Sequence, residues 1–233
     1  MPCDLLVFAP HPDDAEIHCG ATIAAHVRQG ARVVLVDATR GELGSRGTVA
    51  EREREAAAAA AVLGLAARDN LGLPDGGLLA GDRGQRDALV EAIRRHAPRT
   101  VLTIGGEGRH GDHLALHALS LGAAKMAALH KFPSAHPAVA GVRLWCYEAE
   151  LPIAHPALLV PCTEADWERK RAAIHCYGSQ LAGSAGPATT IATPEFERWI
   201  EHRGRTWGFQ AGAAYAEAFS GPELPRIADL RTP

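Results

Sequence analysis

The sequence predicts an α/β fold, a Rossmann-like three-layer sandwich in which a mainly parallel sheet lies between two layers of helices. Short, wholly apolar runs such as 5–9 are typical of parallel strands, which are buried on both faces. Segments with helical spacing separate these runs, and such alternation produces right-handed crossovers. Ligands of these folds bind at the carboxyl ends of the strands, so we expect an active site in the loops that follow strands.

The first third of the chain predicts one βαβ unit and a further helix. A strand over 5–9 is followed by a loop over 10–20, a helix over 21–29 that Gly30 ends, and a strand over 32–37. Six consecutive alanines within 51–65 then predict a strong helix.

The rest of the chain continues the alternation. We expect, in order, a helix over 85–96, a strand over 100–104, a helix over 114–130, strands over 142–147 and 158–161, and helices over 166–180 and 196–203. The Gly- and Pro-rich stretches 133–141 and 182–194 predict long surface loops.

Length and composition favour one domain spanning 1–233. The chain is 47% hydrophobic, which is enough for one sizeable core. A net charge of -3 and scattered arginines give no broad positive field, so we expect no nucleic-acid partner. The first apolar run is too short for a signal-peptide core, and no stretch of about 18 apolar residues predicts a membrane span. Five widely spaced cysteines form no Cys-x-x-Cys pair, so we expect a cytoplasmic protein with reduced thiols.

Two polar clusters follow predicted strands. The first is 10–14, Pro-His-Pro-Asp-Asp, in which His11 and Asp14 are three residues apart and can aim at one point. The second is 109–113, Arg-His-Gly-Asp-His, which ends in His113 just before a predicted helix. Two imidazoles and one carboxylate would leave a fourth position on zinc for water, which is the arrangement of a catalytic site.

The neighbours of these ligands suggest hydrolysis. If Asp14 binds the metal, Asp13 diverges from it and can face the attacking water as a general base. His110 is placed to donate to the negative oxygen that forms during attack on an amide, and Asp112 could orient a histidine. Protonation of the departing amine remains open between Asp13 and His110.

Simpler interpretations compete with the metal site. A lone His-Pro or Asp-Asp is more often a solvated turn. His113 and His117 share a helix face, but the Glu of a His-Glu-x-x-His motif is absent, so we expect His117 to pack or to support a ligand. A nucleotide-binding module with Asp37 as ribose ligand is another class, but the first strand-to-helix turn lacks Gly-x-Gly-x-x-Gly.

At 10–14 and 110–113 the sequence resembles the LmbE-like, or PIG-L, family of zinc-dependent N-deacetylases. The resemblance implies one Zn²⁺ per chain held by His11, Asp14 and His113, although Fe²⁺ or Co²⁺ could use the same donors. It implies Asp13 as general base and His110 as transition-state donor. It also implies an amino-sugar substrate and a homo-oligomer, a trimer or hexamer.

Further stretches resemble the bacillithiol-pathway branch, which deacetylates N-acetylglucosaminyl-malate. These are 39–48, 73–77 and 215–219. In that branch the residues matching Arg52 and Asp75 hold sugar hydroxyls, and Glu42, Ser45 and Arg109 are further substrate-binding candidates. Alternatives within the family are an amidase of thiol conjugates and a chitooligosaccharide deacetylase.

Two positions depart from the family pattern. Gly111 stands where the second motif usually has proline, which loosens that loop without removing a ligand. Phe196 stands where some members carry a tyrosine that assists the oxyanion.

Overall fold

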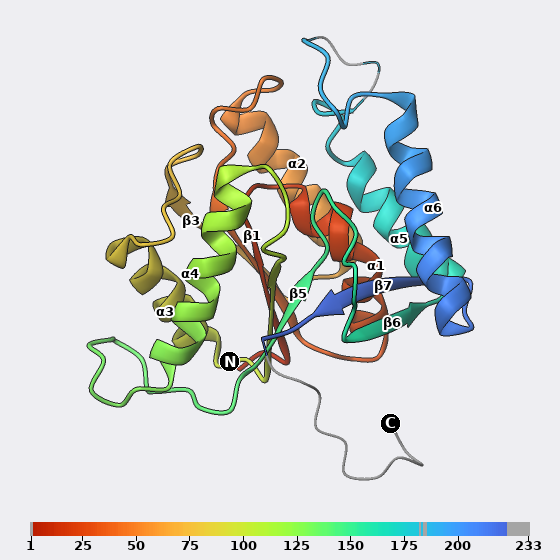
Figure 1. Ribbon diagram of the computed structural model, residues 1–233. Helices are drawn as coiled ribbons and strands as arrows, with labels where there is room; N and C mark the ends of the chain where they lie inside the picture. Colours follow the sequence, from red (N-terminus) through yellow and green to blue (C-terminus); the bar gives the residue numbers. More distant parts are fainter. Residues whose placement is uncertain (1, 182, 184–185, 223–233) are drawn as a thin grey trace.

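The computed structural model of the chain describes residues 2–181, 183 and 186–222. Their strands form one seven-stranded sheet in the order β3-β2-β1-β4-β5-β7-β6 (Figure 1). The strands are β1 (Leu5–Ala9), β2 (Val33–Thr39), β3 (Ala67–Leu73), β4 (Thr100–Ile104), β5 (Arg143–Tyr147), β6 (Leu158–Cys162) and β7 (Tyr215–Ser220). Every pairing from β3 across to β5 is parallel, and only β7 runs antiparallel to its neighbours β5 and β6. The predicted, mainly parallel α/β sheet is confirmed.

Helices cover both faces of this sheet. In the described ranges they are α1 (Asp14–Arg28), α2 (Val49–Leu63), α3 (Arg83–His96), α4 (Gly111–Ala127), α5 (Glu164–His175) and α6 (Pro194–Ala211). Helices α3 and α4 pack together in one layer, whereas α5 packs against α1 and α2 in the other (Figure 1). No helix in the described ranges combines the length and apolar composition that crossing a bilayer requires.

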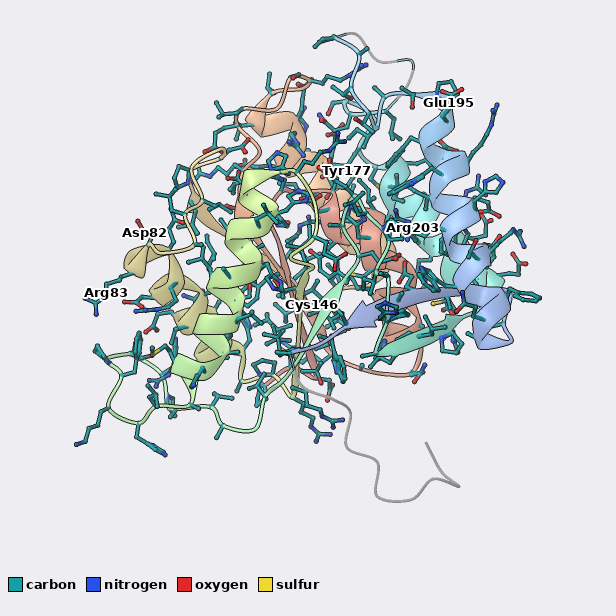
Figure 2. The ribbon with its side chains drawn as sticks, in the orientation of Figure 1. Asp82, Arg83, Cys146, Tyr177, Glu195 and Arg203 are labelled. Carbon is teal, nitrogen blue, oxygen red and sulfur yellow. The ribbon has the colours of Figure 1, made fainter. Side chains whose placement is uncertain are left out.

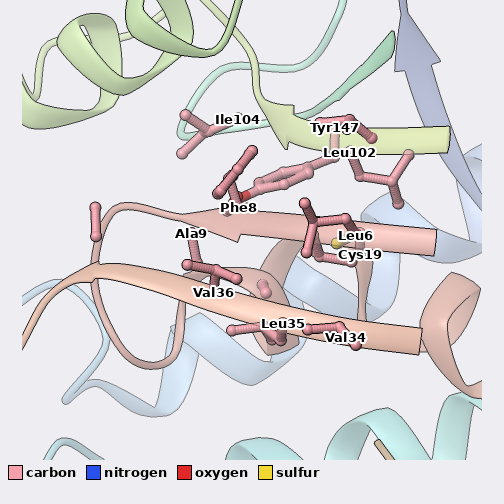
Figure 3. Packing of buried hydrophobic residues seen from close by; sticks show 14 of the residues in the cluster. Leu6, Phe8, Ala9, Cys19, Val34, Leu35, Val36, Leu102, Ile104 and Tyr147 are labelled. Atoms are coloured by element: carbon pink, nitrogen blue, oxygen red, sulfur yellow. The ribbon is translucent and has the colours of Figure 1, made fainter. Parts of the chain in front are cut away.

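The core lies on both sides of the central strands. All five residues of β1 and all seven of β2 are buried, which is why these runs are almost wholly apolar. Figure 3 shows this packing around Phe8 and Val36, with the Tyr147 ring between β1 and β4. The Tyr147 hydroxyl donates to the Phe8 carbonyl at 2.8 Å, so the ring's polar atom is satisfied inside the core.

One prediction near the amino terminus was wrong. Residues 10–20 were predicted to be a loop, but α1 begins at Asp14 and bends at Cys19, where φ is -140°. Asp14 and Glu16 lie in the first turn of this helix, where acidic residues are favourable because they interact with the positive end of the helix dipole. Gly20, the last residue of the predicted loop, lies inside α1 and lets α5 approach, since a Cβ there would lie 3.0 Å from Lys170 Cγ.

Other boundaries also differ from the predictions. The sequence pattern predicts no strand at the polar edge strand β3 or at 215–219, and 215–219 forms most of β7. Helix α4 begins at Gly111 rather than 114, and α6 continues to Ala211 rather than 203. The predicted loop over 182–194 lies partly outside the described residues, and its described part from 186 to 193 carries neither helix nor strand.

Candidate active site

The two polar clusters meet where the strand order reverses. Strand β1 has β2 on one side and β4 on the other, and all three run parallel. Such a switch point opens a crevice at the carboxyl ends of the strands. The loop after β1 delivers His11 and Asp14, whereas the loop after β4 leads to His110 and to His113 in the first turn of α4.

His11, Asp14 and His113 converge on one point. Asp14 Oδ2 lies 3.1 Å from His11 Nδ1 and 3.4 Å from His113 Nε2, and one donor atom of each residue lies within 4.8 Å of the others. Ligands about 2.0–2.1 Å from a tetrahedral zinc are separated by about 3.3 Å, so this spacing fits a metal ion. The cluster faces a cavity, which leaves one side of such an ion open.

The second nitrogen of His11 is held by carboxylates. His11 Nε2 lies 3.0 Å from Asp75 Oδ1 and 3.2 Å from Asp112 Oδ2. Burial disfavours the imidazolium, but the hydrogen bonds to Asp112, Asp14 and Asp75 raise the pKa of His11 to about 12. Carboxylates that accept from the outer nitrogen of a ligating histidine fix its tautomer and raise its basicity.

Asp112 also fixes the loop that carries Asp75. Its carboxylate accepts from the backbone N–H of Gly76 at 2.7 Å and of Leu78 at 3.1 Å. Asp112 therefore lies beside a histidine as predicted, and that histidine is His11.

Asp13 turns away from Asp14 toward Arg52. Its backbone is in a region that residues with a side chain rarely adopt, with φ of 111°. Arg52 Nη2 donates to Asp13 Oδ2 at 3.1 Å and also to the Pro12 carbonyl. Burial raises the pKa of the Asp13 carboxyl to about 7, although the Arg52 charge opposes this shift. A carboxyl with such a pKa can both accept and return a proton near neutrality.

His110 lies directly beside the cluster. Its ring stacks on His113 with centroids 4.6 Å apart and lies 4.9 Å from the His11 ring. Burial lowers the pKa of His110, and the nearby charges of His113 and His11 act in the same direction.

The predicted substrate-binding residues lie in different places. Ser45, Arg52, Asp75 and Arg109 line the cavity, and Arg109 is exposed with its Nε 3.7 Å from Glu150. Glu42 does not line it, because its carboxylate instead accepts from the backbone N–H of Asp75 at 2.9 Å. Arg52 lies in the cavity wall, and its buried Nε has no hydrogen-bond partner among the described residues.

The cavity has a volume of about 760 Å³, and much of its wall was not predicted. His18 faces it from α1, four residues after Asp14 on the same side of the helix, and Trp199 faces it from α6. Residues four apart lie on the same face of a helix, so a helix beginning at Asp14 would place His18 on the side of the cavity. The predicted loop over 10–20 concealed this signal.

Phe196, which stands where some family members carry a tyrosine, lines the cavity. No tyrosine from elsewhere in the described residues lines the cavity in its place. The chain has three tyrosines, and all three hydroxyls donate elsewhere. Their acceptors are the Phe8 carbonyl for Tyr147, Glu16 for Tyr177 and Glu201 for Tyr215. Among the predicted site residues, His110 is therefore the remaining candidate for a donor to the oxyanion.

Comparisons with known proteins agree with this fold and identify a family. The model of the family described as PIG-L, GlcNAc-PI de-N-acetylase, matches residues 6–124, which include both polar clusters. A conserved protein from Thermus thermophilus is similar in structure with a TM-score of 0.87, is 38% identical, and covers 98% of each chain.

Two further comparisons are more distant. The chain is 31% identical to 1D-myo-inositol 2-acetamido-2-deoxy-alpha-D-glucopyranoside deacetylase 1 of Catenulispora acidiphila over 58% of this chain and 52% of that one. The match thus spans about half the length of this curated relative. The 4-carboxy-2-hydroxymuconate hydratase of Pseudomonas putida has a TM-score of 0.80 and covers 98% and 99% of the two chains, but at 24% identity it shows the fold alone.

Proposed function

The chain belongs to the PIG-L family, and from that premise we propose that it is a metal-dependent deacetylase that hydrolyses the N-acetyl amide of an N-acetylglucosamine derivative. The observation that carries this proposal is the cluster of His11, Asp14 and His113, which faces a cavity that Asp13 and His110 also line. The products are acetate and the free amine.

The residues of the cluster suit a divalent cation. When bound, a metal would polarise the acetyl carbonyl and lower the pKa of water. Of its three protein ligands, Asp14 supplies the negative charge, while Asp75 and Asp112 keep the His11 ring in orientation from its other side.

Asp13 and His110 carry out the proton transfer and the stabilisation of negative charge. Asp13 accepts a proton from the attacking water, and Arg52 holds that carboxylate in place. His110 donates to the oxygen of the acetyl group as negative charge develops there. The proton on Asp13 is then available to the departing amine, and His110 is the other candidate for that last step.

The substrate candidates differ in the group attached to the amino sugar, the aglycone. The resemblance of 39–48 and 73–77 favours a malyl aglycone, whereas the Catenulispora relative is named for an inositol glycoside. These aglycones differ in charge, because malate is a dianion at neutral pH and inositol is neutral. Thiol conjugates and chitooligosaccharides are further candidates.

Acetate release and metal analysis test the proposal together. We expect protein reconstituted with one equivalent of Zn²⁺, Fe²⁺ or Co²⁺ to release acetate from at least one glycoside in a panel of N-acetylglucosaminides, and chelation to stop the reaction. The zinc preference and the trimeric or hexameric state are predictions that the same preparation tests by activity and by light scattering. Absence of acetate with every metal and every glycoside would overturn the proposed function.

A further inference from the structure

The cavity extends well beyond the residues that the reaction uses. At about 760 Å³ it lies in the range of pockets that enclose drug-sized ligands, about 300–1,000 Å³. The reaction involves only the acetamido group and its neighbours. Part of the cavity is therefore available to the group attached to the sugar, and the residues lining it from α6 indicate what that group is.

Trp199 provides an aromatic surface that is held rigidly. It is 37% exposed, its ring stacks near Phe196 with centroids 6.0 Å apart, and the His18 ring meets it at 90°. On another side, the Arg203 guanidinium lies 4.0 Å from the Trp199 ring centroid. An aromatic surface held this way loses little conformational entropy when it binds a ligand.

Arg203 is itself fixed, so it is not free to bind an anion. Its two terminal nitrogens donate to the carbonyls of Ala149 at 2.9 Å and Glu150 at 3.0 Å. Arg203 lies on the inner side of α6, well below Glu195 at the end of that helix (Figure 2). Arg203 therefore connects α6 to the segment after β5 and does not line the cavity.

The charged residues of the cavity wall are mostly acidic. The acidic residues that line it are Asp13, Asp14, Asp75, Glu150 and Glu195. The two lining arginines are already beside carboxylates, Arg52 at Asp13 and Arg109 at Glu150. The described lining residues from Gln180 to Trp199 include no basic residue.

A dianionic aglycone would be disfavoured here. A carboxylate placed against the α6 side of the cavity would lose hydration and meet no lysine, arginine or histidine among the described lining residues from Gln180 to Trp199, which is costly. A ring with an uncharged, C–H-rich face would instead bury apolar surface against Trp199.

We propose that the cavity selects an N-acetylglucosaminide whose aglycone is uncharged, with Trp199 as the surface on which that aglycone lies, and that it discriminates against a malyl aglycone. This inference rests on the proposed deacetylase function. It replaces the malyl substrate, favoured by sequence resemblance, with a neutral one on grounds of charge.

The direct test compares kcat/KM for acetate release from three glycosides of the same amino sugar, with inositol, malate and methyl aglycones. We expect kcat/KM for the inositol glycoside to exceed that for the malyl glycoside by about 10-fold or more. A difference of about 1.4 kcal/mol in binding the uncharged rather than the dianionic aglycone gives that factor. A malyl glycoside that is hydrolysed as fast as the inositol glycoside, or faster, would overturn this inference but leave the proposed function intact. Absence of acetate from all three would count against the function itself.

Variants on α6 separate the aromatic surface from general effects on the helix. We expect Trp199→Ala to lower kcat/KM for the inositol glycoside about 10-fold and to change the methyl glycoside much less. Phe209→Ala is the matched control, because Phe209 is 89% exposed on the same helix and does not line the cavity. Equal losses on both glycosides in Trp199→Ala would contradict the assigned role.

A charge reversal provides a gain-of-function test. Glu195 lines the cavity, whereas Glu197 lies 3.2 Å from His175 outside it. We expect Glu195→Lys to raise the rate on the malyl glycoside relative to the inositol glycoside, and Glu197→Lys to leave that ratio unchanged. If both variants change the ratio equally, charge in the cavity does not set the selectivity.

Discussion

Lys170 Nζ lies 2.6 Å from Glu217 Oε1 in the protein interior, where both side chains are almost fully buried. The Glu217 carboxylate also accepts from the backbone N–H groups of Ala21 at 3.3 Å and Thr22 at 2.7 Å. These N–H groups follow the bend of α1 at Cys19, where the regular helical pattern is interrupted. Glu217 therefore caps the second part of α1, while the first part of the same helix carries a predicted metal ligand.

Removing the charge of Glu217 should strongly destabilise the fold. We expect Glu217→Gln to lower the free energy of unfolding by about 3–5 kcal/mol, because it leaves the Lys170 ammonium buried without its partner. Adding Lys170→Met should recover part of that loss. Chemical denaturation measures both. Arg171→Met removes an exposed ion pair with Glu168 and should cost less than about 1 kcal/mol, so a similar cost for Glu217→Gln would contradict the assigned importance of the buried pair.

Variants of the two adjacent aspartates should distinguish a residue needed for proton transfer from one needed for metal binding. Asp13→Asn keeps the three ligating side chains and removes the base, so we expect unchanged metal content and a fall in kcat of about 10²–10⁴-fold. Asp14→Asn removes a charged donor of the cluster and should lose the metal. Metal analysis beside acetate release distinguishes the variants, and the reverse pattern would show that the two roles are exchanged.

Asp166 should contribute stability that is lost in acid. Burial opposes its ionised form, but hydrogen bonds from Arg28 and Thr163 lower the pKa of Asp166 to about 2. Since this folded-state pKa lies below the ordinary value of 3.8, the stabilisation is present above about pH 4 and is lost as the pH falls toward 2.

We therefore expect Asp166→Asn to cost about 1–2 kcal/mol near neutral pH, through loss of the helix cap and of the charged hydrogen bonds. The difference from the natural protein should shrink as the pH is lowered from about 6 to about 3 in denaturation experiments. Glu164→Gln, in the same first turn but exposed, should show little difference at any pH. A difference for Asp166→Asn that is constant with pH would contradict this account.

The central strands and the convergence of the two polar clusters were predictable because their signals are local. Strands β1 and β4 have the predicted bounds, since runs such as Leu5–Ala9 are apolar throughout and end at a turn. The two clusters were predicted to meet because parallel neighbours end at the same edge of the sheet.

The features that were missed depend on tertiary contacts. The polar edge strand β3 is stabilised by Arg68, whose guanidinium bonds Asp37 on β2 and Glu16 on α1, and no local pattern reports such a contact. The first turn of α1 was missed because its residues Asp14 and Glu16 are polar, yet both are buried in the structure. The role of Glu217 was hidden for the same reason, since its partners are nearly 200 positions away in the sequence.

Gly41 should control the site through Arg52. A Cβ at Gly41 would overlap the Arg52 guanidinium, which holds Asp13, so we expect Gly41→Ala to displace Arg52 and lower kcat about 10-fold or more while metal content is kept. Gly212→Ala is a matched control, because its φ of +65° is close to the +67° of Gly41 and no atom lies within 4 Å of the added carbon. Both variants should lose about 1 kcal/mol of stability from backbone strain.

Only Gly41→Ala should lose activity, and combining it with Arg52→Ala should add little, because both changes remove the same contact with Asp13. Equal activity losses in the two alanine variants would mean that strain alone is responsible. Fully additive losses in the double variant would mean that Gly41 acts on the site by some route other than Arg52.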